Sequence, residues 1–413
     1  MPFFRPTLDQ LSAFPFARLR RLLAEVAPPS AIAPLDLSIG EPRHKPPPWV
    51  ADILEAERGL WNRYPPPDGT PSLRRACAAW LERRYRLPQG MLDPDANVLP
   101  LAGTKEGLFL LPQLLEARAA DGGRRLVLMP DPLYAVYYAA AVLHGFVPHP
   151  LPATRASGFL PDLAALTPEL LGRTALIFLC SPANPQGAAA DRGYLRRLIA
   201  LCREWDVLLA VDECYADIYD RTPPTGALEV AAEDGDLSGL VVFHSLSKRS
   251  SAPGLRSAFV AGDAEVLRRF LHLRSYAAAV QPLPIARAAE ALWRDAEHVA
   301  ENRRRYRRKL DLAERRLRGR FGFYRPEGGF FLWLDVGDGI AAARRLWQEA
   351  ALKVLPGSFL CAGKNGGEAG RRYIRLALVH EEEVVEEALL RLVRVLDGGV
   401  GAEPPYGVGR KGL

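Results

Sequence analysis

The chain has 413 residues, of which 48% are hydrophobic and 25% are charged, and its formal net charge is +6. The length exceeds what one compact core accommodates and suits one large and one smaller domain, while the composition excludes a largely disordered chain. Five dispersed cysteines without a C-x-x-C pair give no sign of a disulfide framework or a zinc site, so we expect no metal.

Charge and hydropathy also bear on partners and location. The basic residues are scattered along helical segments rather than gathered in an arm, so a solvated basic face explains them more simply than nucleic acid, and small anionic substrates remain an alternative. No run approaches the roughly 18 apolar residues of a membrane span, and the N-terminus lacks a signal-peptide pattern. We therefore expect a cytoplasmic protein with no membrane or nucleic-acid partner.

The first predicted elements lie before residue 86. An amphipathic helix is predicted over 16–26, and a short strand over 35–39 ends at a turn that contains Gly40. Tyr64 begins a proline-rich loop, and a helix with proline at its first position is predicted over 71–85. Taken alone, Gly40 is a plain turn residue or part of a ligand pocket, and Tyr64 is a loop-packing residue.

A glycine turn follows the next predicted strand, 97–101, and leads into a helix ending near residue 115. Gly103, Thr104 and Lys105 occupy this turn. A helix start offers free backbone N–H groups to a phosphate, and Thr104 is equally suited to cap the helix. A strand over 124–129 then precedes Tyr134, an aromatic side chain that either stacks on a heteroaromatic ring or packs in the core, like the Tyr137 and Tyr138 that follow it.

Two further strands end in polar residues. The strand 174–179 leads into S-P-A-N-P-Q-G, where Asn184 lies in what is otherwise only a turn pattern. The apolar strand 207–211 ends at Asp212, with Tyr215 just beyond it. A carboxylate at the end of a buried strand is costly unless a cation or strong donor pairs with it, the alternative being a helix cap.

Lys248 lies in a Ser/Gly/Pro loop between two predicted strands, 240–244 and 257–261. Such a loop emerges at the sheet edge where open α/β folds bind ligands. A deprotonated lysine forms a Schiff base with an aldehyde, and Ser245, Ser247 and Arg256 can hold a phosphate dianion. Aldehyde plus phosphate indicates pyridoxal 5'-phosphate as cofactor, the alternative being a solvated surface lysine.

The remaining elements are a helix over 264–275, one long helical pattern over 284–318, a strand beginning near 328, a helix over 340–350 and a strand over 372–379. Arg375 on the last strand has the planar fork that carboxylate recognition requires, although a surface-strand arginine is an alternative. We expect an N-terminal segment 1–45 that joins the small domain, a large cofactor-binding domain 46–285, a C-terminal small domain 286–397 and a disordered tail 398–413.

The segment S-L-S-K-R-x-x-x-P-G-L-R around Lys248 resembles the lysine segment of class I, fold-type I pyridoxal phosphate aminotransferases. The segments that resemble the family's other motifs follow in its order from Gly40 to Arg375. The resemblance implies an α/β fold of the pyridoxal-phosphate-dependent transferase type I, with a mainly parallel sheet in the large domain and a smaller α+β domain. It also implies a homodimer with shared active sites, an amino-acid donor and a 2-oxo acid acceptor.

The resemblance also implies individual roles. Lys248, Asp212 and Tyr215 are the implied catalytic residues, with Asp212 on the ring nitrogen of the cofactor and Tyr215 on its phenolic oxygen. The implied cofactor-binding residues are Gly103, Thr104, Lys105, Tyr134, Asn184, Asp212, Tyr215, Ser245, Ser247, Lys248, Arg256 and, from the neighbouring subunit, Tyr64. The implied substrate-binding residues are Gly40, Asn184 and Arg375.

Over the whole chain, segments such as L-S-I-G-E-P-R-H and V-L-P-G-S are similar to those of the proteobacterial succinyldiaminopimelate aminotransferases of lysine biosynthesis, although Ala258 departs from their usual form. This implies N-succinyl-L,L-diaminopimelate and 2-oxoglutarate as substrates, with Arg43, His44 or Lys45 as candidates, by position only, for the succinyl carboxylate. An aromatic, alanine or aspartate aminotransferase and a β-lyase remain alternatives. The ligand-sensing domain of a transcription regulator is a further alternative, which would need a DNA-binding domain before the first motif.

Overall fold

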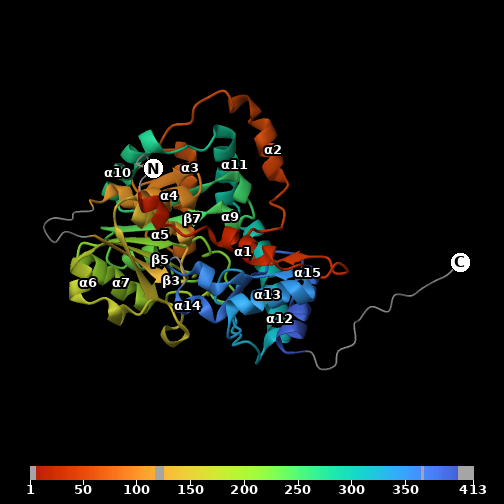
Figure 1. The fold of residues 1–413 in the computed structure, drawn as a ribbon. Helices are drawn as coiled ribbons and strands as arrows, with labels where there is room; N and C mark the ends of the chain where they lie inside the picture. Colours follow the sequence, from red (N-terminus) through yellow and green to blue (C-terminus); the bar gives the residue numbers. More distant parts are fainter. Residues whose placement is uncertain (1–5, 117–124, 364–366, 399–413) are drawn as a thin grey trace.

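The computed structural model describes residues 6–116, 125–363 and 367–398. A seven-stranded sheet forms the centre of its larger part, with the strand order β2-β8-β7-β6-β5-β3-β4 (Figure 1). The run from β7 to β4 is parallel, and β8 is antiparallel to both of its neighbours. The strands are β2 (Val98–Leu101), β3 (Leu126–Asp131), β4 (Val147–Pro152), β5 (Thr174–Cys180), β6 (Leu208–Asp212), β7 (Leu240–Ser245) and β8 (Ala258–Gly262).

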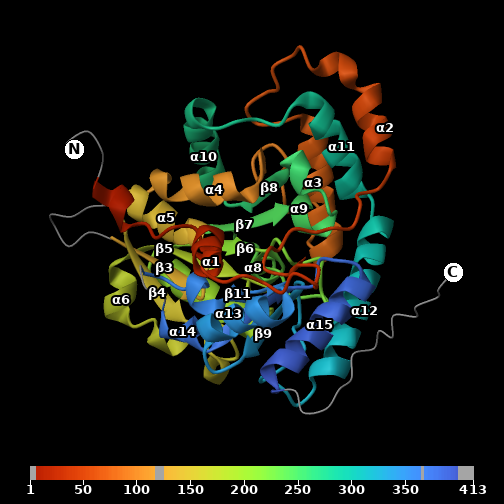
Figure 2. The same ribbon diagram turned by 45° about the vertical axis from the view of Figure 1, so that its right-hand side comes forward.

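Helices cover both faces of this sheet, which is why the inner strands are continuously apolar. One face packs against α3 (Pro71–Tyr85), α7 (Arg192–Glu204), α8 (Ala227–Ala231) and α11 (Leu283–Arg294). The other packs against α4 (Thr104–Leu110), α5 (Ala135–Leu143) and α10 (Ala264–Ala277) (Figure 2). Two hydrophobic cores therefore lie on either side of one rigid sheet.

The smaller part is built around an antiparallel sheet of the order β11-β12-β9. Its strands are β9 (Phe331–Asp335), β11 (Leu355–Pro356) and β12 (Tyr373–Ala377). Helices α12 (Glu297–Leu317), α13 (Gly339–Ala350) and α15 (Glu382–Leu396) share one apolar cluster with this sheet. The expected α/β fold class is thus confirmed: a mainly parallel large sheet and a smaller α+β part.

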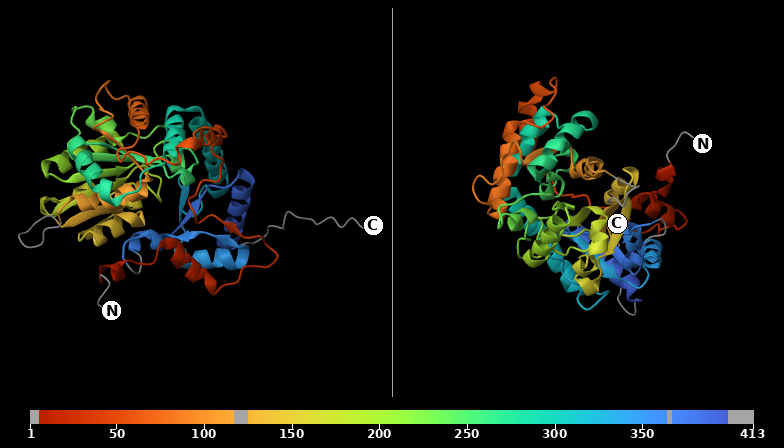
Figure 3. Two further views of the ribbon diagram at one scale, coloured as in Figure 1. Left: turned by 90° about the horizontal axis from the view of Figure 1, so that it is seen from above. Right: turned by 90° about the vertical axis from the view of Figure 1, so that its left-hand side faces the viewer.

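The N-terminal segment lies against the C-terminal part of the chain. Leu19 and Leu23 of α1 (Pro15–Ala24) pack with Trp333 and Trp347, and Figure 3 shows α1, in red, beside the blue C-terminal elements. The predicted strand 35–39 is shorter than expected: β1 (Leu35–Asp36) pairs in parallel with β10 (Leu352–Lys353). The exact domain boundaries stay predictions.

Two expectations about helices and strands need correction. The pattern over 284–318 forms two helices, because the helical run breaks at Asp295 and Ala296 between α11 and α12. Strand β4 was not predicted; its sequence V-P-H-P-L-P carries three prolines, which sheets tolerate at an edge, and β4 is an edge strand. Short helices complete the fold: α2 (Trp49–Ala56), α6 (Pro168–Gly172), α9 (Leu246–Arg249) and α14 (Glu368–Arg371).

The described residues contain neither a helix suited to span a membrane nor a cluster suited to bind a metal. Within 6–116, 125–363 and 367–398, no helix is long and apolar enough to cross a membrane. In the same ranges, no group of three or more histidine, cysteine or acidic side chains could hold a metal ion. The predicted tail begins at residue 398, and residues 399–413 lie outside the described part of the chain.

Candidate active site

A cavity of about 530 Å³ opens at the carboxyl ends of three parallel strands, where α/β sheets bind ligands. Cys180, Asp212 and Ser245, the last residues of β5, β6 and β7, lie in its wall. The smaller part of the fold contributes Phe331 and Arg375. The cavity is lined by these residues from the predicted site: Gly40, Thr104, Lys105, Tyr134, Asn184, Asp212, Tyr215, Ser245, Ser247, Lys248, Arg256 and Arg375.

Lys248 lies on α9, a single turn that follows β7. The Ser245 side chain caps this turn by accepting a hydrogen bond from the Ser247 N–H at 3.1 Å. The Lys248 Nζ donates to the Gly40 carbonyl at 2.5 Å. Burial lowers the pKa of Lys248 from 10.5 to about 8. A substantial fraction of this amine is therefore neutral at mildly alkaline pH, as a nucleophile or proton acceptor requires.

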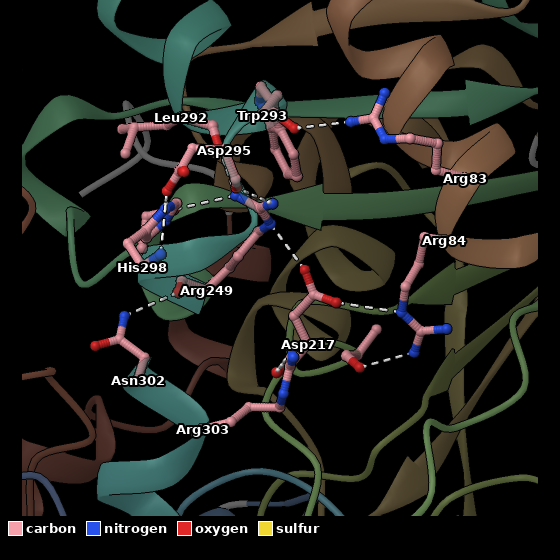
Figure 4. Close-up of polar contacts among 12 residues, drawn as sticks. Arg83, Arg84, Asp217, Arg249, Leu292, Trp293, Asp295, His298, Asn302 and Arg303 are labelled. Carbon is pink, nitrogen blue, oxygen red and sulfur yellow. Dashed lines mark hydrogen bonds and ion pairs between the residues drawn. The ribbon is translucent and has the colours of Figure 1, made fainter. Parts of the chain in front are cut away.

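The lysine turn is anchored by the next residue, Arg249, which does not line the cavity. Its buried guanidinium donates from Nε to Asp217 Oδ2 at 2.7 Å, from Nη1 to the Leu292 carbonyl at 2.6 Å and from Nη2 to the Asp295 carbonyl at 3.1 Å (Figure 4). Burial alone would raise the pKa of Asp217, but Arg249 and Arg84 hold it below its ordinary value. This ion pair fixes the backbone that carries Lys248.

Asp212 is 6% exposed and has two donors. The Tyr137 hydroxyl donates to its Oδ2 at 2.7 Å, and the Cys214 backbone N–H donates to its Oδ1 at 3.2 Å. These bonds hold a carboxylate in a buried position that would otherwise be costly. Because Asp212 lines the cavity, it is placed to meet a cation or a strong donor there.

Arg375 is a buried cation without a carboxylate partner among the described residues. Its Nη1 donates to Asn184 Oδ1 at 3.1 Å and its Nη2 to the Ser38 carbonyl at 2.7 Å, while its buried Nε has no partner in the described chain. Burial lowers the pKa of Arg375 from 12.5 to about 10. A ligand carboxylate in the cavity would supply the missing counter-charge.

The family model for aminotransferases of classes I and II matches residues 33–392. The chain belongs to this family. It is 32% identical, over 394 residues, to an LL-diaminopimelate aminotransferase from Desulforudis audaxviator, which covers 93% of this chain and 96% of that protein. It is 33% identical, over 360 residues, to the 4-dedimethylamino-4-oxo-anhydrotetracycline transaminase OxyQ from Streptomyces rimosus, covering 87% and 92% of the two chains.

Solved structures agree with this assignment. An aminotransferase from Neisseria meningitidis superposes with a TM-score of 0.89 at 38% identity, covering 95% of this chain and 100% of that one. A probable N-succinyldiaminopimelate aminotransferase from Thermus thermophilus superposes with a TM-score of 0.80 at 26% identity, covering 92% and 98%. The protein is therefore an aminotransferase of this fold.

Membership implies pyridoxal phosphate, and the cavity of this aminotransferase has the groups to hold it. Ser245, Ser247 and Arg256 offer hydroxyls and a guanidinium for the phosphate dianion. Gly103 has φ +95°, and a Cβ at this position would lie 2.0 Å from Arg256 Nη2, so glycine leaves the room that this guanidinium occupies. The donor set fits the cofactor.

Three residues predicted to bind the cofactor make no contact within the described chain that tests their predicted role. Tyr64 is 100% exposed in the single chain, so its role toward a neighbouring subunit stays a prediction. Lys105 is exposed at the rim of the cavity, with its Nζ 5.4 Å from the centre of the Phe14 ring. Thr104 does not cap α4: the cap residue is Gly103, and Thr104 Oγ1 instead contacts Cys214 Sγ at 3.4 Å.

The prediction of His44 as a candidate to bind the succinyl carboxylate of the donor is wrong. The residue is 3% exposed, and its Nε2 lies 2.8 Å from the Lys309 Nζ. Burial and the neighbouring Lys309 lower the pKa of His44 to about 4, so it carries no charge near neutral pH. Arg43 and Lys45 are exposed and do not line the cavity, and they stay candidates by position only.

The sequence pointed neither to the contact between Tyr137 and Asp212 nor to the apolar wall of the cavity. Tyr137 lies in a hydrophobic core, one of the two placements expected for it, and from there its hydroxyl donates to Asp212. Its position three residues after Tyr134 was the available signal for this contact. The cavity also has a wall of apolar side chains. No local sequence pattern predicted this apolar wall, because its residues come from segments far apart in the chain. They are Phe14, Pro15, Phe16, Ile39, Leu133, Phe331 and Leu360.

Proposed function

We propose that this aminotransferase transfers the α-amino group of a diaminopimelate-type amino acid to 2-oxoglutarate, and that N-succinyl-L,L-diaminopimelate is its physiological donor. One observation carries the catalytic part of this proposal: a partly buried lysine of lowered pKa, Lys248, and a buried arginine with no counter-ion among the described residues, Arg375, line the same cavity. A base beside an unpaired carboxylate receptor is what proton transfer at the α-carbon of an amino acid requires.

The cofactor, when bound, supplies the carbonyl group and the electron-withdrawing ring that this chemistry needs. Arg375 binds and orients the α-carboxylate of the donor, with Asn184 fixing one side of its guanidinium at 3.1 Å. Lys248 accepts the proton from the α-carbon of the donor and would deliver it to the carbonyl carbon that the cofactor supplies. Asp212, held by Tyr137, would keep a proton on the ring nitrogen of the cofactor.

Tyr215 is a donor candidate for the phenolic oxygen of the cofactor. It is 6% exposed and lines the cavity, and burial raises the pKa of its hydroxyl well above the ordinary value. The hydroxyl therefore stays protonated and can donate. Tyr134, on the same cavity wall, is the proposed stacking partner of the ring.

Two observations support the proposed substrate: the names of related proteins and the room beside the catalytic cavity. Relatives named as LL-diaminopimelate aminotransferases are 32% identical to this chain, and a solved relative at 26% identity is named a probable N-succinyldiaminopimelate aminotransferase. A second cavity of about 280 Å³ shares Phe14, Lys105, Leu133 and Leu360 with the first, which gives room for a long donor side chain. Because the relatives at 32% identity are named for the unmodified compound, L,L-diaminopimelate is the second candidate donor.

We also propose a homodimer in which Tyr64, fully exposed in the single chain, reaches the cofactor phosphate of the neighbouring subunit. Measurement of the molar mass in solution tests the dimer. Substitution of Tyr64 by phenylalanine should weaken cofactor binding without changing that mass. A monomer that binds the cofactor and is fully active would contradict this part of the proposal.

The substrate is tested by the visible spectrum of the cofactor-loaded enzyme. Four donors are added separately: N-succinyl-L,L-diaminopimelate, L,L-diaminopimelate, glutamate and an aromatic amino acid. The proposal predicts that the succinylated donor discharges the cofactor band at a far lower concentration than the aromatic donor. Conversion by the unmodified diaminopimelate alone would reassign the donor, and conversion by the aromatic donor alone would refute the diaminopimelate class.

A β-lyase on the same fold is separated by its products, since it would release pyruvate and ammonia instead of a 2-oxo acid with the full carbon chain. Arg43 is tested as the receptor of the succinyl carboxylate. Replacement of Arg43 by glutamine should raise KM for the succinylated donor and leave KM for glutamate unchanged. Equal effects on both donors would remove Arg43 from the proposal.

A further inference from the structure

A further cavity is lined by Arg249, the residue after Lys248, and shares no lining residue with the catalytic cavity. Six arginines line it, and we call it the arginine pocket: Arg83, Arg84, Arg86, Arg249, Arg294 and Arg303. We propose that the arginine pocket is a binding site for a small, multiply charged oxyanion of the phosphate or pyrophosphate class. The proposal does not depend on which amino acid the enzyme transaminates.

Charge balance is the first argument. The two carboxylates that line the pocket are already paired, Asp217 with Arg84 at 3.2 Å and Arg249 at 2.7 Å, and Asp295 with His298. Arg294 is paired with Glu290 at 2.8 Å. Among the described residues, the guanidinium groups of Arg83 and Arg86 have no carboxylate partner, and Arg303 makes no ion pair but lies near enough to Asp217 to help lower the pKa of that carboxyl.

Unused hydrogen-bond donors are the second argument. A guanidinium has five N–H donors. In the described chain, Arg303 uses one of its donors, from Nη1 to the Asp217 carbonyl at 3.4 Å, and Arg83 uses one, from Nη2 to the Trp293 carbonyl at 3.5 Å (Figure 4). The remaining N–H groups of the Arg83 and Arg303 guanidinium groups can donate to an oxyanion. A planar guanidinium matches the spacing of the oxygens of a phosphate group.

Aromatic rings hold some of these cations in place. The Arg303 guanidinium lies 4.6 Å from the centre of the Tyr219 ring, and that of Arg84 lies 5.9 Å from it. Arg249 stacks on Trp293 at 4.9 Å. Rings that bind guanidinium faces leave their N–H edges exposed, so the pocket is partly organised before an anion arrives.

Size restricts the ligand. The pocket has a volume of about 300 Å³, at the small end of the range for ligand sites, which suits an inorganic anion or the terminal phosphates of a small metabolite. Six arginines against two paired aspartates favour an anion of at least two charges over a monocarboxylate.

The test is calorimetric titration of inorganic pyrophosphate into the cofactor-loaded enzyme at about 0.15 M salt, with inorganic phosphate and citrate as parallel ligands. The cofactor occupies its own phosphate site, so binding there is excluded. We expect saturable binding of pyrophosphate that weakens as salt is raised. Preference for citrate over both phosphates would overturn the assigned ligand class, and absence of saturable binding would overturn the site.

Substitutions of two arginines test whether the anion binds in the arginine pocket. Arg83→Gln and Arg303→Gln, made singly and together, should each weaken pyrophosphate binding by about 10-fold, since each removes one charged partner. Arg268→Gln is the matched control, because Arg268 is an exposed arginine on α10, paired with Glu265 and absent from the pocket lining. An unchanged cofactor spectrum and melting temperature show that the variants fold. Equal binding by the double variant and the control would overturn the proposal.

Discussion

Replacement of Arg375 by lysine tests the carboxylate receptor most sharply. The fall in the pKa of Arg375 from 12.5 to about 10 corresponds to about 3 kcal/mol of unfavourable burial of its charge. A bound carboxylate would offset this cost. Lysine keeps the charge but loses one of the two parallel hydrogen bonds, each worth about 1.5–3 kcal/mol with charged partners. We therefore expect KM for glutamate to rise about 10- to 100-fold.

Steady-state kinetics with glutamate and 2-oxoglutarate measure this effect. The matched control is Arg372→Lys, three residues earlier, where an exposed arginine pairs with Asp335 at 3.0 Å on the same strand region. The control should leave KM unchanged. If Arg375→Lys also leaves KM unchanged while the enzyme remains folded and loaded with cofactor, Arg375 does not bind the carboxylate.

Three further predictions concern the support of the cavity. Tyr137→Phe removes the 2.7 Å bond to Asp212 and should lower kcat about 10-fold, measured in the same assay; an unchanged kcat would contradict the role given to Tyr137. Gly103→Ala forces a Cβ against Arg256 at φ +95°, and cofactor titration should show affinity about 10-fold weaker or more, whereas wild-type affinity would contradict the crowding. Asp217→Asn leaves buried arginines short of a counter-charge and should lower the unfolding free energy by about 3–5 kcal/mol in denaturant titration. Because the folded-state pKa of Asp217 is below 3.8, the difference from wild type should persist at neutral pH and shrink only as the pH falls below about 4; a difference that vanishes at pH 7 would refute the ion pair.

The sequence predicted the fold class and most strands well because buried parallel strands are continuously apolar and end in recognisable turns. Helix 71–85 was predicted with the bounds that the structure has, since proline begins it. The pattern over 284–318 was wrongly predicted as one helix, because the break at Asp295 and Ala296 contains neither glycine nor proline. Strand β4 was missed because its prolines oppose any single-sequence strand assignment.

The polar residues of the site were easier to predict than their contacts. Asp212 ends a strand, and Lys248 and Asn184 lie within four residues of the end of theirs, so the parallel sheet brings them to one edge and the structure places all three in one cavity. The prediction for His44 rested only on its position after the Gly40 turn and was wrong. Its burial against Lys309 depends on α12, more than 250 residues later in the chain. The apolar wall likewise arises from tertiary packing of the N-terminal segment.

The most direct test of the central claim is a single turnover of the cofactor-loaded enzyme with L-glutamate and no acceptor. Transamination through this cavity predicts one equivalent of 2-oxoglutarate per bound cofactor, loss of the cofactor's visible band and no ammonia. Recovery of the band should then require a 2-oxo acid. Release of ammonia, or more than one equivalent of 2-oxoglutarate without an acceptor, would contradict the account.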